Sequence, residues 1–336
     1  MKRIVGINRQ VKIIDDEMPS IKGKPSYILV KTMYSAISPG TELSMLGESG
    51  GETVHLGYSA MGKVVEVGEA ITDVRVGDLV ACYGAPYVHH DEYLAVPKTL
   101  YAKIPEGLDP KEAALGGLGA IAIHALRIAN LQFGEIAVVV GLGILGQLIA
   151  KIGNAAAYNV IALDVQKARV EMLKEEGIKA FSDQKEMEAA LSEESRGFGA
   201  DSVLLCIGGK RSPLTHVALD WIRKGGNVVI VGDVEPDFPR EMMFIKEARL
   251  FISRAGGPGR YDPVFEREAI DYPYQYVRWT EGRNLAEYLR LVKEGKIDVK
   301  PFITDVIDYR EAPFEFEKLK EKSSAVLTKL IRFSNE

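Results

Sequence analysis

The chain has 336 residues, of which 46% are hydrophobic and 26% are charged, as is usual for folded globular proteins. Its net charge of −5 excludes the basic excess that nucleic-acid binding requires, and its two cysteines cannot build a disulfide framework and suit the reducing cytoplasm. We therefore expect a cytoplasmic protein without a nucleic-acid partner. Its longest apolar run, residues 136–150, is too short and too interrupted by glycine to cross a membrane, and residues 1–7 show no signal peptide.

The N-terminal region, up to about Leu115, has the pattern of short β-strands. Residues 27–34, 62–68 and 74–82 are rich in apolar and β-branched side chains, and glycine, proline and acidic turn residues separate them. This pattern is typical of a small β-barrel or sandwich.

The middle region, from about Leu118 to Arg254, alternates helical and strand patterns. Such alternation predicts right-handed βαβ units on a parallel sheet, which is an α/β fold of the doubly wound Rossmann type. The strands that we expect are 135–140, 159–163, 201–206, 226–231 and 248–253.

A GxGxxG motif follows the first of these strands and is the most informative motif of the chain. Gly141 permits a tight turn, Gly143 lets the backbone approach a pyrophosphate, and Gly146 lets helix and strand pack closely. Ile144 and Leu145 stand where a helix begins, and the free N–H groups there attract phosphate. The motif predicts a dinucleotide cofactor site.

An acidic residue ends the second strand of this region. Asp164 lies 18 residues after Gly146 (164 − 146 = 18), close to the spacing of about 20 expected for the carboxylate that binds the adenosine ribose. Such a carboxylate accepts hydrogen bonds from the ribose hydroxyls and repels a 2′-phosphate, so we predict NAD as the cofactor. The alternative is a glycine-rich turn without a ligand, with Asp164 on the surface as a cap of the next helix.

The region after Arg254 begins with an irregular segment at residues 255–280, rich in arginine and aromatic side chains. Such a segment suits either a hydroxylated substrate or an oligomer contact. A helix is predicted over 284–294, followed by mixed strand and helix over 303–333.

These patterns predict an interrupted domain organisation. Residues 1–117 and 283–336 are expected to form one domain, into which the nucleotide domain, 118–254, is inserted. Residues 255–282 are expected to be an irregular inserted loop.

Several motifs together resemble the medium-chain dehydrogenase/reductase superfamily, which is alcohol dehydrogenase-like. The resemblance covers nearly the whole chain, and it implies a GroES-like β-barrel catalytic domain, a Rossmann domain, an active-site cleft between them, and homodimers or homotetramers. Besides the glycine turn and Asp164, it rests on the segments 62–68 (GKVVEVG), 76–80 (VGDLV), 91–97 (DEYLAVP), 104–107 (IPEG) and 301–307 (PFITDVI).

The zinc ligands of that superfamily are replaced in this chain. Where zinc-dependent members read Cys-Gly-Thr-Asp, the chain reads Pro39-Gly-Thr-Glu42; where they read Gly-His-Glu, it reads Gly57-Tyr-Ser59; the third ligand falls near Gly116. None of these supplies the Cys, His or carboxylate set of a catalytic zinc site. The four-cysteine structural zinc site is also absent. The pattern resembles the zinc-free branch with bacteriochlorophyllide hydroxyethyl dehydrogenase-like proteins.

A substitute metal site at Cys82, His89, His90 and Glu92 has suitable residue types. However, adjacent histidines of an extended chain point to opposite faces, which argues against a shared ion. We predict no metal.

Without zinc, a positioned side chain must handle the hydroxyl proton. The resemblance puts Thr41 where the family contacts the substrate alcohol, and Tyr58 at a ligand position that faces the cleft. A tyrosine there could act as the acid–base if a nearby cation lowers its pKa. The ordinary pKa of a histidine suits proton transfer at neutral pH, which makes His90 a candidate. Glu42 replaces an acid of the family and could orient Tyr58 or a histidine. The family's relay histidine falls at Ser44. Alternatively, Tyr58 fills the space left by the metal, Thr41 caps a turn, His90 is a structural histidine, and Glu42 forms an ion pair with a lysine.

Further cofactor contacts carry over from the resemblance. Arg169 falls where relatives place a basic residue against the adenosine ribose. Small residues after two later strands leave room for the cofactor, although the glycines could equally be plain turn residues. They are Cys206, Ile207, Gly208, Val231 and Gly232.

These residues lead to one expected activity and two alternatives. We expect a zinc-independent oxidoreductase that transfers hydride between NAD(H) and a secondary alcohol or ketone of a polyol, sugar or related hydroxylated small molecule. One alternative is a quinone or enoyl reductase, which usually takes NADPH and which Asp164 disfavours. The other is a non-catalytic NAD-binding protein, because lost zinc ligands also fit an inactive relative.

Overall fold

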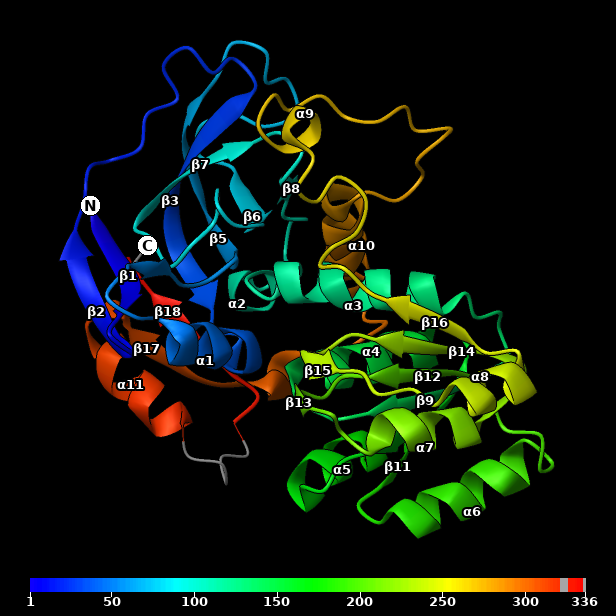
Figure 1. Ribbon diagram of the computed structural model, residues 1–336. Coiled ribbons are helices and arrows are strands. Elements are labelled where there is room, and N and C mark those ends of the chain that lie inside the picture. Colours follow the sequence, from blue (N-terminus) through cyan, green and yellow to red (C-terminus); the bar gives the residue numbers. More distant parts are fainter. Residues whose placement is uncertain (321–325, 335–336) are drawn as a thin grey trace. The chain divides into compact units, whose positions relative to one another are not determined.

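A computed structural model describes residues 1–320 and 326–334 (Figure 1). The chain divides into two compact units. The first unit comprises Met1–Ala120 and Ala255–Glu336, and the second comprises Ile121–Arg254. Residues 255–282, expected as a separate inserted loop, are part of the first unit.

The first unit is built on a mostly antiparallel sheet. Its strand order is β17-β18-β3-β5-β6-β8, with β7 paired to β3, and a smaller sheet has the order β2-β1-β4. The strands are β1 (Lys2–Ile7), β2 (Gln10–Asp15), β3 (Tyr27–Ala36), β4 (Val54–His55), β5 (Ser59–Val67), β6 (Leu79–Tyr83), β7 (Tyr93–Pro97), β8 (Tyr101–Lys103), β17 (Ile303–Asp308) and β18 (Thr328–Arg332).

Helices of the first unit begin at recognisable caps. Thr280 accepts a hydrogen bond from the Arg283 N–H, and α10 therefore begins at Glu281 rather than at the expected residue 284. The segment 255–280 is irregular as expected, apart from a short helix, α9. The helices are α1 (Pro39–Glu48), α2 (Pro110–Ala113), α9 (Pro263–Glu266), α10 (Glu281–Lys293), α11 (Ala312–Leu319) and two 3₁₀ turns (Lys300–Phe302 and Tyr309–Glu311), while α3 (Gly116–Ala129) runs on into the second unit.

The second unit is a parallel sheet with strand order β11-β10-β9-β12-β14-β16 (Figure 1). Numbered along the chain this is 3-2-1-4-5-6, the order of dinucleotide-binding sheets, so the predicted α/β fold class is confirmed. The strands are β9 (Ile136–Val140), β10 (Asn159–Leu163), β11 (Lys179–Phe181), β12 (Ala200–Leu205), β14 (Ile222–Ile230) and β16 (Arg249–Ile252), with a small pair β13 (Gly209–Lys210) and β15 (Val234–Glu235).

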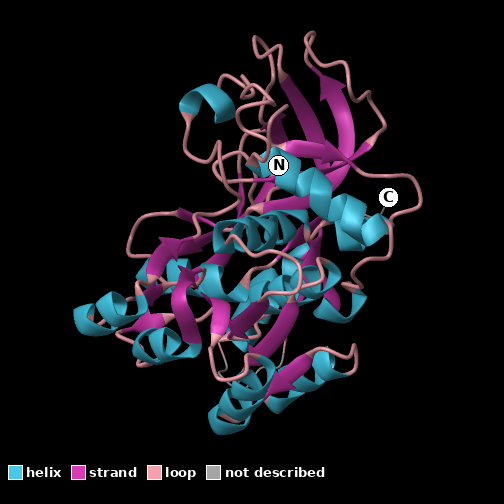
Figure 2. Ribbon diagram, turned by 90° about the vertical axis from the view of Figure 1, so that its right-hand side faces the viewer, coloured by secondary structure: helices cyan, strands magenta, loops and turns pink. Residues whose placement is uncertain are grey.

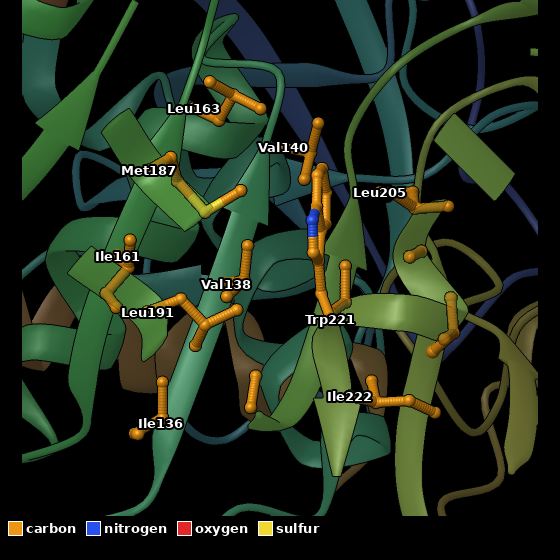
Figure 3. Close-up of a cluster of buried hydrophobic side chains, with 14 of the residues drawn as sticks. Ile136, Val138, Val140, Ile161, Leu163, Met187, Leu191, Leu205, Trp221 and Ile222 are labelled. Atoms are coloured by element: carbon orange, nitrogen blue, oxygen red, sulfur yellow. The ribbon is translucent and has the colours of Figure 1, made fainter. Parts of the chain in front are cut away.

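The helices of the second unit cover both faces of this sheet. Met187 and Leu191 of α6 and Trp221 of α7 pack on Val138, Ile161 and neighbouring strand residues (Figure 3), while α4 lies on the other face. Burial on both faces explains the continuous apolar strand runs in the sequence. The helices are α4 (Ile144–Ala155), α5 (Lys167–Lys174), α6 (Gln184–Glu194), α7 (Leu214–Trp221) and α8 (Arg240–Lys246).

Helices and strands alternate along this part of the chain, and Figure 2 distinguishes the two by colour. The expected strands agree with β9, β10, β12, β14 and β16 to within a few residues, but the short edge strand β11 was not predicted. Across residues 1–320 and 326–334, no helix combines the length and the apolar character needed to span a bilayer.

Candidate functional site

The glycine turn connects β9 to α4 at the point where the strand order reverses. Gly141 has a φ of +89°, which favours glycine, and a Cβ there would lie 2.8 Å from the carbonyl oxygen of Cys206. A Cβ at Gly146 would overlap the carbonyl oxygen of Gly141, so only glycine lets helix and turn approach this closely. A Cβ at Gly143 meets no atom of the described residues within 4 Å. The backbone at Gly143 is therefore open to a ligand.

The helix that follows supplies the polar groups of this turn. Gly143 is the N-cap of α4, and its carbonyl accepts the Gln147 N–H at 2.9 Å. The first N–H groups of the helix, from Ile144 onward, have no acceptor within the helix and carry the positive end of its dipole. Leu145 is half-buried in this first turn. The arrangement fits a pyrophosphate.

Asp164 is tied to the glycine turn itself. Its Oδ2 accepts the Leu142 N–H at 2.6 Å, and its Oδ1 accepts the Gln166 N–H at 2.7 Å just before α5. Arg169 lies 3.7 Å from Oδ2 and neutralises part of the charge. Asp164 is buried rather than on the surface. Each carboxylate oxygen can accept a second hydrogen bond, so Asp164 can still accept hydrogen bonds from the hydroxyl groups of a ribose.

The ends of β12 and β14 complete this region. The Cys206 N–H donates to Val140 at 2.8 Å, and the N–H groups of Val231 and Gly232 both donate to Leu205 at 2.9 Å. A Cβ at Gly232 would overlap the Ile207 carbonyl, and one at Gly208 would lie 3.4 Å from the carbonyl oxygen of Asp233. Burial raises the pKa of the Cys206 thiol to about 12, so the thiol stays protonated and unreactive at neutral pH.

In the first unit, Tyr58 joins a cluster of hydroxyl groups. Its hydroxyl donates to Ser38 Oγ at 2.7 Å and also hydrogen-bonds the Thr41 side chain. Burial, together with the nearby Glu42, raises the Tyr58 pKa to about 12. The sequence-based role of Tyr58 as a base assumed a cation that lowers this pKa, and the shift found is in the opposite direction. Thr41 is exposed and connects the cluster to solvent.

Glu42 and His90 form a fully buried pair behind this cluster. His90 Nε2 lies 2.8 Å from Glu42 Oε2, and His90 Nδ1 lies 2.8 Å from Ser35 Oγ. Glu42 Oε1 accepts the Ser38 backbone N–H at 2.7 Å. Both ring nitrogens of His90 are therefore occupied by protein groups. Because Glu42 meets Ser38 through a backbone N–H, the pair and the Tyr58 hydroxyl share no continuous chain of hydroxyl groups.

The four residues weighed as a substitute metal site point to separate partners. His89 Nδ1 lies 3.2 Å from the Gly57 carbonyl, and Glu92 accepts the Lys2 N–H at 2.9 Å. Cys82 is buried in β6, and burial raises its pKa. Over the described parts of the chain, no group of three or more His, Cys, Asp or Glu residues could hold a metal ion.

The positions of the superfamily's zinc ligands do not fit zinc. Pro39 has no donor side chain, and Tyr58 presents a neutral hydroxyl that is hydrogen-bonded to Ser38, whereas zinc prefers thiolate, imidazole and carboxylate ligands. A Cβ at Gly116, near the third position, would lie 2.5 Å from Leu285 Cδ1, so α10 fills that space.

Sequence reasoning did not identify Ser35 or Ser38 as site residues. A serine directly before Pro39 is a helix-start signal that could have marked Ser38 as a cap. Ser35 meets His90, which is 55 residues away in the sequence, and no local pattern indicates this contact.

Three kinds of comparison agree with this fold. Residues 141–269 match a family model described as zinc-binding dehydrogenase. The chain is 28% identical to the probable D-xylulose reductase A of Aspergillus clavatus, over 93% of this chain and 91% of that protein.

Solved structures are similar over nearly the full length. The alcohol dehydrogenase TADH of Thermus sp. ATN1 matches with a TM-score of 0.79 and 22% identity, covering 99% of both chains. The galactitol-1-phosphate dehydrogenase of Escherichia coli matches with a TM-score of 0.80 and 17% identity, covering 99% of this chain and 100% of that one. Taken together, these matches make the chain similar over nearly its full length to medium-chain, zinc-binding-type dehydrogenases/reductases.

Proposed function

We propose that the protein is an NAD-dependent oxidoreductase that works without a catalytic zinc ion. Its substrate would be a secondary alcohol, or the corresponding ketone, of a polyol, sugar or related hydroxylated metabolite. The observation that carries this proposal is the hydroxyl cluster of Tyr58, Ser38 and Thr41, in which Tyr58 stands at a position where zinc-dependent members have a ligand. The names of the relatives, a xylulose reductase and a galactitol-1-phosphate dehydrogenase, support a polyol-type substrate.

The second unit has residues that would hold the cofactor. The open backbone at Gly143 and the first turn of α4 would bind the pyrophosphate, and Asp164 would bind the adenosine ribose. When bound, the nicotinamide supplies or accepts the hydride.

The choice of NAD over NADP rests on the surroundings of Asp164. A 2′-phosphate placed at this carboxylate would meet a negative charge. Arg169 could favour a phosphate, but it already lies 3.7 Å from the Asp164 carboxylate. NADH is therefore expected to bind more tightly than NADPH in fluorescence titrations, and the reverse order would contradict this part of the proposal.

Tyr58 is the proposed proton donor. With a pKa of about 12 it keeps its proton at neutral pH, so it can donate a hydrogen bond to a ketone oxygen. Once reduced, the substrate oxygen would be an alkoxide, a much stronger base than a phenolate, and would take this proton from Tyr58. Thr41, which is exposed and hydrogen-bonded to Tyr58, would return a proton from solvent. Glu42 and His90 would position Ser38 rather than touch the substrate.

A homodimer or homotetramer is part of the proposal. Strand β16 ends the strand order of the parallel sheet, and Ile252 at its end is 71% exposed. An exposed sheet edge with apolar side chains suits pairing with another chain. Light scattering of the purified protein measures this, and a monomer at all concentrations would contradict it.

A turnover screen tests the activity. Purified protein, with its zinc content measured by mass spectrometry, is mixed with NADH and ketoses or with NAD and polyols, and absorbance of NADH is followed. Turnover without stoichiometric zinc supports the proposal. Turnover that is lost with a chelator and restored by zinc contradicts the metal-free part. Tight NADH binding with no turnover of any polyol, sugar, quinone or enone indicates a non-catalytic protein.

A further inference from the structure

Glu281, the first residue of α10, has a carboxyl group that the proposed mechanism does not use. The residue is fully buried, and with its carboxyl ionised neither oxygen has a hydrogen-bond partner among the described residues. A buried charge without a donor is costly. The carboxyl of Glu266 faces it and can accept a hydrogen bond once Glu281 carries a proton.

The charges around Glu281 do not balance if both carboxyls are ionised. Arg260 is the cation of the group, and its NH1 donates to Glu266 Oε1 at 2.6 Å and to the Ala85 carbonyl at 2.5 Å. Glu266 Oε1 also accepts the Tyr261 N–H at 3.1 Å. One guanidinium therefore matches one carboxylate. Glu266 has the donors that stabilise the charged form, and Glu281 is left to be neutral.

The other groups that face Glu281 do not reverse this assignment. Tyr83 and Tyr272 are uncharged, and the pKa of each hydroxyl is raised. The positive N-terminal end of α10 and the charge of Arg260 both favour an ionised Glu281. Burial is the larger effect and raises the pKa of Glu281 to about 8.

Glu281 is connected to Tyr58 through packed groups. The Glu281 N–H donates to the Pro258 carbonyl at 3.0 Å, and Asn284 Nδ2 donates to the Gly256 carbonyl at 2.8 Å, so the start of α10 fixes this segment. Gly256 lies against Tyr83, because a Cβ there would be 2.5 Å from Tyr83 Cε1. The rings of Tyr83 and Tyr58 meet edge to face, with centroids 6.3 Å apart.

We propose that Glu281 is a positioning residue for Tyr58, acting as a neutral acid whose proton is shared with Glu266. The shared proton holds the segment 256–260 against Tyr83, and Tyr83 forms the wall against which the Tyr58 ring packs. Loss of this proton leaves an excess negative charge in a buried cluster, which loosens the segment. The link to catalysis rests on the proposed function, whereas the protonation state of Glu281 does not.

Infrared spectroscopy tests the protonation state without any assay of activity. The difference between wild type and Glu281→Gln at pH 7 should show the carbonyl band of one protonated carboxyl group, and this band should disappear as the pH is raised through about 8. The absence of that band at pH 7 would overturn the proposal, even if the enzyme is active.

The positioning role is tested with two substitutions and the best substrate from the turnover screen. The kcat of the wild type should fall as the pH rises through about 8, where Glu281 loses its proton. Glu281→Gln keeps a neutral hydrogen-bond donor at every pH. It should therefore retain most of the wild-type kcat at pH 7 and show no such fall. Glu281→Ala removes the donor and should lower kcat by about tenfold or more, because small misplacements of reacting groups are costly. A Gln variant as impaired as the Ala variant, or an Ala variant with wild-type kcat and pH profile, overturns the role.

The two proposals can fail separately. If no substrate is turned over, the unfolding free energy is measured by urea titration from pH 5 to 9. Wild type should lose stability relative to Glu281→Gln as the pH rises from about 4.5 toward 8, because in this range the unfolded carboxyl is ionised while the folded one still holds its proton. Parallel curves would refute the shared proton even in a protein without activity.

Discussion

The imidazole of His90 and the carboxylate of Glu42 lie 2.8 Å apart, and both side chains have no exposed surface. They come from positions 48 residues apart in the sequence, and together they fix the backbone of Ser38 at the start of α1. This pair ties the β-sheet of the first unit to the helix that carries Thr41.

Removing one member of this pair should therefore weaken the fold. His90→Ala leaves a buried carboxylate without its partner, and we expect a loss of about 3–5 kcal/mol in the free energy of unfolding, measured by urea denaturation. His216→Ala is the matched control, because its ion pair with Asp237 is about half exposed and should contribute less than about 1 kcal/mol. Equal small losses in both variants would show that the buried pair is not structural.

Tyr58→Phe tests the proton donor. The substitution removes one hydroxyl and leaves the ring packed on Tyr83, so the fold and NADH binding should be nearly unchanged. We expect kcat to fall about 10²-fold or more, in line with the usual contribution of an acid or base. Tyr93→Phe, in β7 of the same unit, should leave kcat unchanged. A wild-type kcat in Tyr58→Phe would show that Tyr58 only fills the space left by the metal and donates no proton.

The glycine turn offers a matched pair of substitutions. Gly146→Ala puts a Cβ into the Gly141 carbonyl, which is backbone and cannot move aside, so we expect a loss of about 2 kcal/mol or more in stability. Gly143→Ala meets open space and should change stability by less than about 0.5 kcal/mol.

The same pair separates folding from binding. In Gly143→Ala the new methyl group occupies the space through which a pyrophosphate approaches, so the Kd for NADH should rise about tenfold, or about 1.4 kcal/mol, in a fluorescence titration. An unchanged Kd in a folded Gly143→Ala variant would place the cofactor elsewhere.

The stability of the protein should fall in mild acid because of buried histidines. Burial lowers the pKa of both His89 and His124 from 6.5 to about 4. Between these values the unfolded chain binds more protons than the folded one, so stability is fully present above pH 6.5 and is lost as the pH falls toward 4.

His124→Gln isolates one of these two contributions. The variant should lose less stability than wild type over this range, by about 1.4 kcal/mol per pH unit, in urea denaturation at pH 7, 6 and 5. His216→Gln, at an exposed histidine, should follow the wild-type curve. A His124→Gln curve parallel to wild type would mean that this histidine titrates normally in the fold.

The sequence predicts the second unit better than the first. Continuous apolar runs in the sequence predict the buried strands. The spacing of the three glycines predicts a tight turn, and in the structure a Cβ at Gly141 or Gly146 would collide with the backbone. These features depend on residues that are close together in the sequence, so the sequence alone predicts them. Strand β11 was not predicted because its three residues at a sheet edge, Lys179–Phe181, are too few to form a recognisable pattern.

The candidate site of the first unit depends on contacts that no local pattern reveals. The sequence selected Tyr58, Thr41, Glu42 and His90 through a family resemblance, but it could not show that His90 is enclosed between Glu42 and Ser35. Burial also reverses the pKa shift that was assumed for Tyr58. Protonation states depend on neighbours brought together by the tertiary fold, such as Glu266 and Glu281.

The two hydrogen bonds of Asp164 limit how the coenzyme preference could be redesigned. The carboxylate that is proposed to discriminate against a 2′-phosphate also holds the Leu142 N–H and the Gln166 N–H. Exchanging it for a small or basic residue, a usual step in converting such enzymes to NADPH, would release both donors and loosen the turn. A conversion must therefore keep an acceptor for the Leu142 N–H and place the new positive charge at a neighbouring position, because the carboxylate proposed to select the cofactor also holds the turn in place.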